Sequence, residues 1–170
     1  MVVPQNCTSF WPARGSIENQ PVRRPESVDC RAFWLLAAID GHAKNFSFYI
    51  LPDGAFQLTP LYDVMTAYPI IAKGQLAVQK ATLAMALHGK NRHYKIQWIQ
   101  PRHWISTAST IKYSEKLARR HLGEMFAMVD DVIDTASKEL PKNFPENIAA
   151  HTFDGMHKVR DANIQLIKGL

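Results

Sequence analysis

The stretch "AIDGHAKNFSFYI", from Ala38 to Ile50, changes within a few residues from an apolar, helix-like pattern to an alternating, aromatic one. The apolar run before it ends at Asp40-Gly41, a pair that is typical of a turn after a helix. The segments "FSFYIL", "PDG" and "AFQLTP" then follow in the order strand, turn and strand. The sequence therefore predicts a helix from about Ser27 to Asp40, a short polar loop and a β-hairpin.

The second half of the chain is predicted to be helical. Between residues 114 and 140, apolar side chains recur at the three- and four-residue spacing of one buried helix face, with Ser114 as the cap and Pro141 at the end. A further helix is expected to begin near Pro145. Residues 83–99 fit a second hairpin, although a helix through Ala81 to Leu87 is an alternative.

The first 26 residues hold four prolines and little periodicity, which favours an irregular segment. We therefore expect a leader at residues 1–26 and one domain at residues 27–170, mainly α with short β-hairpins. The longest apolar run, Ala32 to Ile39, is too short to cross a membrane, and the first residues lack the pattern of a signal peptide. With two widely spaced cysteines, the composition is typical of a cytoplasmic protein without membrane contact.

The basic residues, tryptophans and histidines allow predictions about which parts of the chain form the surface and which form the core. The net charge is +5, with basic residues concentrated at 90–95 and 112–121, where they can meet phosphate or form a solvated surface. Trp34, Trp98 and Trp104 are predicted to be core residues. The histidines outside the polar loop show no spacing typical of metal ligands, so we expect them to serve packing or to lie at the surface.

The polar loop carries the residues that are best suited to catalysis or metal binding. Asp40 and Asn45 lie at its two ends, and Asp63 follows the second strand, so a hairpin would fold Asp63 back toward Asn45. Phosphoryl transfer uses such a set: a carboxylate that orients and deprotonates a hydroxyl, and oxygen ligands for Mg²⁺. In the alternative interpretation, Asp40 only ends a helix and Asn45 only caps the loop.

The motifs "DGHAKNFSFYI" and "FQLTPLYDVMTAYP" closely resemble the catalytic segment of HipA-like serine/threonine kinases, the toxins of bacterial toxin-antitoxin pairs. The resemblance covers roughly Phe33 to Asn163. It implies a protein-kinase-like C-terminal lobe in which Asp40 is the catalytic base and Asn45 and Asp63 bind Mg²⁺ and, through it, ATP. Val64 and Met65 replace the last two residues of the usual DFG motif, as this family's pattern implies.

Two further loop residues are candidates. Lys44 is expected either to neutralise a transferring phosphate or to be an ordinary exposed lysine. His42 is expected either to orient Asp40 or, as the favoured interpretation, to stabilise the loop structurally.

A kinase normally grips its nucleotide with an amino-terminal lobe that carries a Gly-rich loop and a strand lysine. Before Asp40 this chain has one glycine, Gly15, and its first lysine is Lys44. We therefore expect the C-terminal lobe alone, with little activity toward a protein substrate unless a separately encoded amino-terminal lobe completes it.

Two other functions stay open at this point. The first is a non-catalytic interaction module that binds an antitoxin-like DNA-binding protein, or nucleic acid, through basic helices. Its candidate residues are Lys90, Arg92, Lys95, Lys112, Lys116, Arg119 and Arg120. The second is metal-dependent hydrolysis by Asp40, His42 and Asp63, which fits the hairpin less well.

Overall fold

The computed structural model describes residues 30–52 and 56–169. The expected leader, Ser27 and the centre of the "PDG" turn lie outside these residues. Helices dominate, with two separate two-stranded antiparallel sheets, so the expectation of a mainly α fold with short hairpins is confirmed. The elements are α1 (Cys30–Leu35), β1 (Phe48–Ile50), β2 (Phe56–Leu58), α2 (Tyr68–Ala72), β3 (Thr82–His88), β4 (Arg92–Lys95), α3 (Pro101–Thr110), α4 (Glu115–Ala127), α5 (Val129–Glu139) and α6 (Glu146–Lys168).

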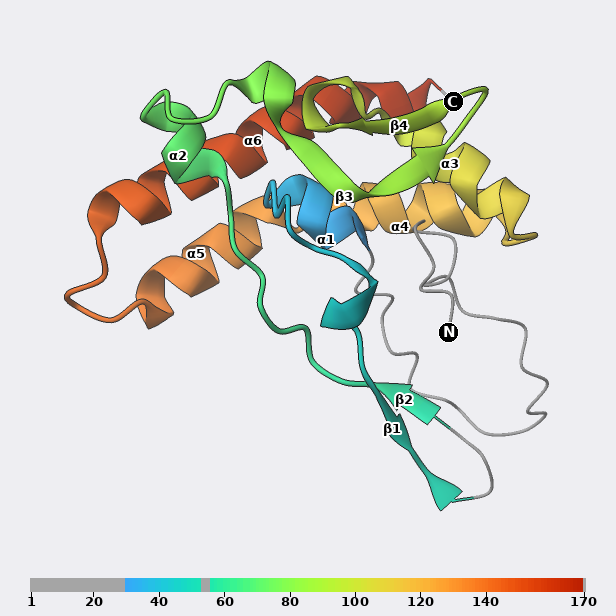
Figure 1. Cartoon of the computed structure of the whole chain (residues 1–170), viewed down its shortest axis with the longest axis horizontal. Coiled ribbons are helices and arrows are strands. Elements are labelled where there is room, and N and C mark those ends of the chain that lie inside the picture. The colour runs from blue at the N-terminus through green and yellow to red at the C-terminus, as the bar shows by residue number, and fades with distance from the viewer. Residues whose placement is uncertain (1–29, 53–55, 170) are drawn as a thin grey trace.

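Both hairpins form where the sequence predicts them. In the first, Phe48 lies opposite Leu58 and Ile50 opposite Phe56. The second pairs β3 with β4, which excludes the alternative of a helix through Ala81 to Leu87. Figure 1 shows the β1–β2 hairpin extending away from the helices, whereas β3 and β4 lie against them.

The core forms around aromatic side chains from three helices. The Trp34 ring of α1 packs against Trp104 of α3 at 5.7 Å and against Phe126 of α4 at 5.8 Å between ring centroids. All three are almost fully buried, and Leu83, Met85 and Leu87 of β3 belong to the same cluster. Trp34 and Trp104 are thus core residues as predicted, whereas the prediction for Trp98 is wrong, because its side chain is 60% exposed.

Helix α1 is shorter than predicted. It ends at Leu35, and Ala37 takes a left-handed backbone conformation with φ of 48°. The amide of Ala38 donates to the carbonyl of Phe33 at 2.7 Å, and the amide of Ala37 donates to that of Trp34 at 3.1 Å. These two bonds form a Schellman motif, which stops a helix. The motif usually has glycine where Ala37 stands, so no sequence signal announced this end.

The helix predicted over residues 114–140 is divided in two at Met128. Ser114 caps α4 as expected, its hydroxyl accepting from the amide of Leu117 at 3.4 Å. Met128 has ψ of −4°, away from helical values near −42°, so α5 starts after a local turn. The buried stripe nevertheless continues across the break, from Leu122 and Phe126 to Val129 and Ile133.

Helix α6 begins directly after Pro145, as predicted, and packs along α2, α4 and α5. Its Gly155 lies against the ring of Tyr68 in α2, and the hydroxyl of Tyr68 donates to the carbonyl of Leu35 in α1 at 3.1 Å. In the described ranges, no helix combines the length and the apolar character needed to cross a bilayer.

Candidate functional site

The polar loop is held against α1 by an aromatic contact. The Phe33 ring, 1% exposed, meets the Phe46 ring edge-on at 5.4 Å. Gly41 lies so close to Phe33 that a Cβ atom there would be 2.4 Å from the ring. The packing of Phe33 therefore fixes the chain on both sides of the loop, just after Asp40 and just after Asn45.

Asn45 organises the loop from within. It ends the short 3₁₀ helix Ala43–Asn45, and its side chain is buried. Its side-chain Oδ1 accepts a hydrogen bond from the backbone amide of His42 at 2.9 Å. The backbone amide of Asn45 donates to the carbonyl of His42 at 3.0 Å. Asn45 is thus a loop cap, as one interpretation of the sequence held.

The side chain of Asn45 also reaches Asp63. Its Nδ2 donates to Oδ2 of Asp63 at 3.4 Å, across 18 positions of sequence. The expected approach of Asp63 to Asn45 through the hairpin is therefore confirmed. Asp63 has φ of 57°, a left-handed conformation that Asp tolerates better than most residues and that is enriched at functional sites.

Tyr62 fastens the second arm of the hairpin to the loop. Its hydroxyl donates to the carbonyl of Lys44 at 2.6 Å and lies 2.9 Å from the hydroxyl of Ser47. The amide of Thr59 adds a bond to the carbonyl of Ser47 at 2.9 Å. Sequence reasoning missed this role of Tyr62, although its position immediately before Asp63 in "TPLYD" was a usable signal.

The side chains of the other three candidates, Asp40, His42 and Lys44, have fewer contacts with the rest of the site. The side chains of Asp40 and Lys44 are exposed, and His42 is half-buried. Within the described part of the chain, no hydrogen bond or ion pair joins the Asp40 carboxylate to Asn45 or Asp63, and Nδ1 of His42 is buried without a hydrogen-bond partner. The structure therefore brings Asn45 and Asp63 together and leaves Asp40 and Lys44 facing solvent.

The described residues include no group of three or more His, Cys, Asp or Glu side chains that could hold a metal ion by themselves. The nearest oxygen donors are the Asp63 carboxylate and the Asn45 amide oxygen, which also accepts the amide of His42. Mg²⁺ is commonly bound by one or two such protein oxygens together with substrate phosphates and water. The chemistry of this donor pair thus suits a Mg²⁺ ion that arrives with a phosphate ligand.

Comparison with solved structures identifies the fold. HipA of Shewanella oneidensis MR-1, solved in a toxin-antitoxin complex with HipB and its operator DNA, matches with a TM-score of 0.65 and 17% sequence identity. The match covers 97% of this chain but 41% of the HipA chain, so this chain spans less than half the length of that relative. The family described as the HipA-like C-terminal domain matches residues 29–133, and the chain therefore belongs to this family.

Proposed function

We propose that this chain is the catalytic C-terminal lobe of a HipA-type serine/threonine kinase, which transfers phosphate from ATP to a protein in the cytoplasm. The observation that carries the proposal is the contact between Asn45 and Asp63. It pairs the two residues that match the family's Mg²⁺ ligands, at the end of a hairpin that leaves the Asp63 carboxylate exposed. In this role Mg²⁺ would neutralise charge on the nucleotide phosphates.

The other loop residues take the remaining roles in this proposal. Asp40 accepts the proton of the substrate hydroxyl, which requires an accessible carboxylate such as the exposed one at this position. Lys44, also exposed, is placed to compensate charge on the transferred phosphate. His42 supports the loop, since its backbone amide is tied to Asn45.

Full activity is proposed to need an amino-terminal lobe. The β1 strand exposes three consecutive large side chains, Phe48, Tyr49 and Ile50, at 48%, 54% and 88%. Because successive side chains of a strand point to opposite faces, Phe48 and Ile50 share one face, and exposed apolar groups of this kind are typical of surfaces covered by another domain or protein. Because positioning dominates phosphoryl transfer, the isolated chain should transfer phosphate very slowly.

Calorimetric titration with ATP, with and without Mg²⁺, tests the site. With a HipA-type amino-terminal lobe added, the chain should bind ATP in a Mg²⁺-dependent manner, and Asp63→Asn should remove the Mg²⁺ dependence. Asp40→Asn should leave binding unchanged and abolish transfer to protein. Asp134→Asn, an exposed carboxylate on α5, is the matched control and should change neither. The proposal fails if Asp63→Asn and Asp134→Asn bind Mg²⁺ and ATP equally well.

A second candidate function is binding of an antitoxin-like DNA-binding protein. The observation in its favour is that the solved relative was found in a complex with HipB and operator DNA. Co-elution of the chain with such an antitoxin on size-exclusion chromatography tests this function. Asp40→Asn should not affect co-elution, so the two candidate functions can be separated in one set of variants.

A further inference from the structure

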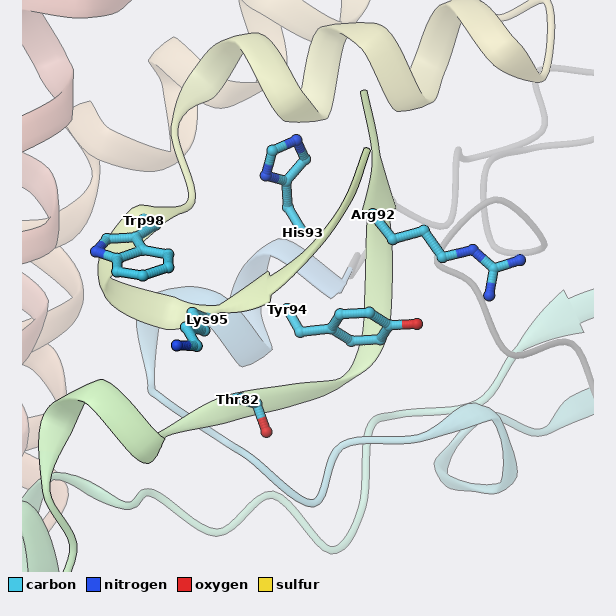
Figure 2. Close-up of a pocket in the computed structure, with 6 residues that line it drawn as sticks. All are labelled: Thr82, Arg92, His93, Tyr94, Lys95 and Trp98. Carbon is cyan, nitrogen blue, oxygen red and sulfur yellow. The ribbon is translucent and has the colours of Figure 1, made fainter. Parts of the chain in front are cut away.

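The β3–β4 hairpin carries a hollow that the proposed kinase site does not use. Its volume is about 360 Å³, within the range of ligand pockets. Figure 2 shows its six lining residues around the two strands and the turn that follows β4. They are Thr82, Arg92, His93, Tyr94, Lys95 and Trp98.

Trp98 gives this hollow a flat aromatic surface. It ends the 3₁₀ helix Ile96–Trp98, between the buried residues Ile96 and Ile99, so its backbone is anchored while its ring is 60% exposed. The ammonium group of Lys95 lies 4.4 Å from the centre of the ring. The ring thus carries a cation on one face and keeps more than half of its surface accessible to a stacking partner.

The charge around the hollow is positive and uncompensated. Arg92, Lys95 and the nearby Lys90 are exposed, and none of them forms an ion pair with a described residue. No acidic residue lines the hollow. On the basic helix α4, by contrast, Arg120 is already paired with Glu124 at 3.3 Å. The hairpin therefore offers unpaired positive charge to a phosphate group, whereas Arg120 on α4 does not.

Another lining residue, His93, stacks on His103 of α3. The rings of His93 and His103 lie parallel, 3.7 Å apart at an angle of 9°. Burial, together with the neighbouring His93 and Arg102, lowers the pKa of His103 to about 4, so this ring is neutral near pH 7. The stacked pair joins β4 to α3 at the hollow.

We propose that this hollow binds single-stranded nucleic acid, with a base stacked on Trp98, its phosphate held by Lys95, and a phosphate farther along the strand held by Arg92, whose side chain points away from Trp98 in Figure 2. Proteins bind single strands by this combination of aromatic platforms and a basic groove. A duplex keeps its base faces stacked inside the helix and offers Trp98 only its backbone. The site shares no residue with the Asn45–Asp63 pair, so it adds a function to the proposed kinase lobe.

Fluorescence anisotropy of a labelled oligothymidylate, titrated with the full 170-residue chain, tests the proposal. Trp98→Ala should weaken binding about tenfold, the loss expected for one stacked base, and Trp98→Phe should restore most of the affinity. Arg92→Gln and Lys95→Gln should each reduce the salt slope of log K by about 0.7. Lys116→Gln, an exposed basic residue on α4, is the charge-matched control and should change affinity least.

A blunt-ended duplex without a loop and heparin serve as competitors that present phosphate or sulfate without unpaired bases. The single-strand proposal requires that unlabelled oligothymidylate compete more strongly than either. It is overturned if the wild-type chain does not bind the oligonucleotide, or if Trp98→Ala binds as tightly as the wild type. Equal effects of Lys116→Gln and Arg92→Gln would also overturn it, because they indicate binding to diffuse positive charge. Circular dichroism of each variant verifies that the fold is intact.

Discussion

Replacement of Gly41 by alanine tests the packing that fixes the polar loop. The added Cβ would lie 2.4, 2.6 and 2.7 Å from three carbons of the Phe33 ring, whereas carbon atoms pack best at about 3.5–4.0 Å. The ring has little room to retreat, because it is 1% exposed and faces Phe46 at 5.4 Å. Either the loop or α1 must shift.

The expected change in the free energy of unfolding is the sum of two opposing contributions. Overpacking by one methyl group in a filled core costs about 1–3 kcal/mol. The alanine also reduces the entropy of the unfolded chain, which returns about 0.4–1 kcal/mol where the backbone accepts it. We therefore expect Gly41→Ala to lower the free energy of unfolding by about 1–2 kcal/mol, and the melting temperature by roughly 2–8 °C for a chain of this size.

Urea denaturation followed by circular dichroism measures the effect. Gly123→Ala is the matched control, since a Cβ at Gly123 in α4 meets no atom within 4 Å. That variant should gain about 0.5–1 kcal/mol from helix propensity. The same substitution thus lowers the free energy of unfolding at Gly41 and raises it at Gly123. If Gly41→Ala were as stable as the wild type, the close contact with Phe33 would not be a constraint on the loop, and the reasoning would be refuted.

Three more results are expected. Gly155→Ala should destabilise the chain by about 1 kcal/mol in urea despite better helix propensity, because its Cβ would meet the Tyr68 ring at 2.4 Å; stabilisation would contradict this. Asn45→Ala should cost about 1–2 kcal/mol and accelerate hydrogen exchange of the His42 amide, which loses its acceptor; unchanged exchange would count against the loop-cap role. Because the folded pKa of His103, about 4, lies below its usual 6.5, the unfolded chain binds more protons between these values. The chain should therefore lose stability as pH falls from about 6.5 toward 4, and His103→Gln should lose less over that interval in thermal melts.

The sequence was a good guide where local chemistry decides the structure. The turn signal in "PDG" and the aromatic run before it sufficed to predict the first hairpin, and the hairpin sufficed to predict that Asp63 returns to Asn45. Ser114 and Pro145 likewise marked the starts of α4 and α6. In each case the residues that determine the geometry lie within a few positions of the element they define.

Prediction failed where tertiary packing overrides local preference. Ala37 ends α1 in a left-handed conformation, and its carbonyl accepts the amide of Ala67, a partner 30 positions away that no local pattern reveals. The break at Met128 involves neither proline nor glycine. Trp98 looked like a core residue by type, but its exposure depends on the buried Ile96 and Ile99 beside it. The roles of Asp40, Lys44 and His42 stay predictions.

The exposure of β1 connects the fold with the proposed activity. Alternating residues in a strand usually imply one buried face, yet Phe48, Tyr49 and Ile50 are all exposed. A two-stranded hairpin by itself is only marginally stable in water. Because this hairpin is what carries Asp63 to Asn45, a partner that covers β1 would also stabilise the pair. In the proposed kinase, an amino-terminal lobe would therefore contribute twice, by holding the nucleotide and by fixing the hairpin that positions the metal ligands.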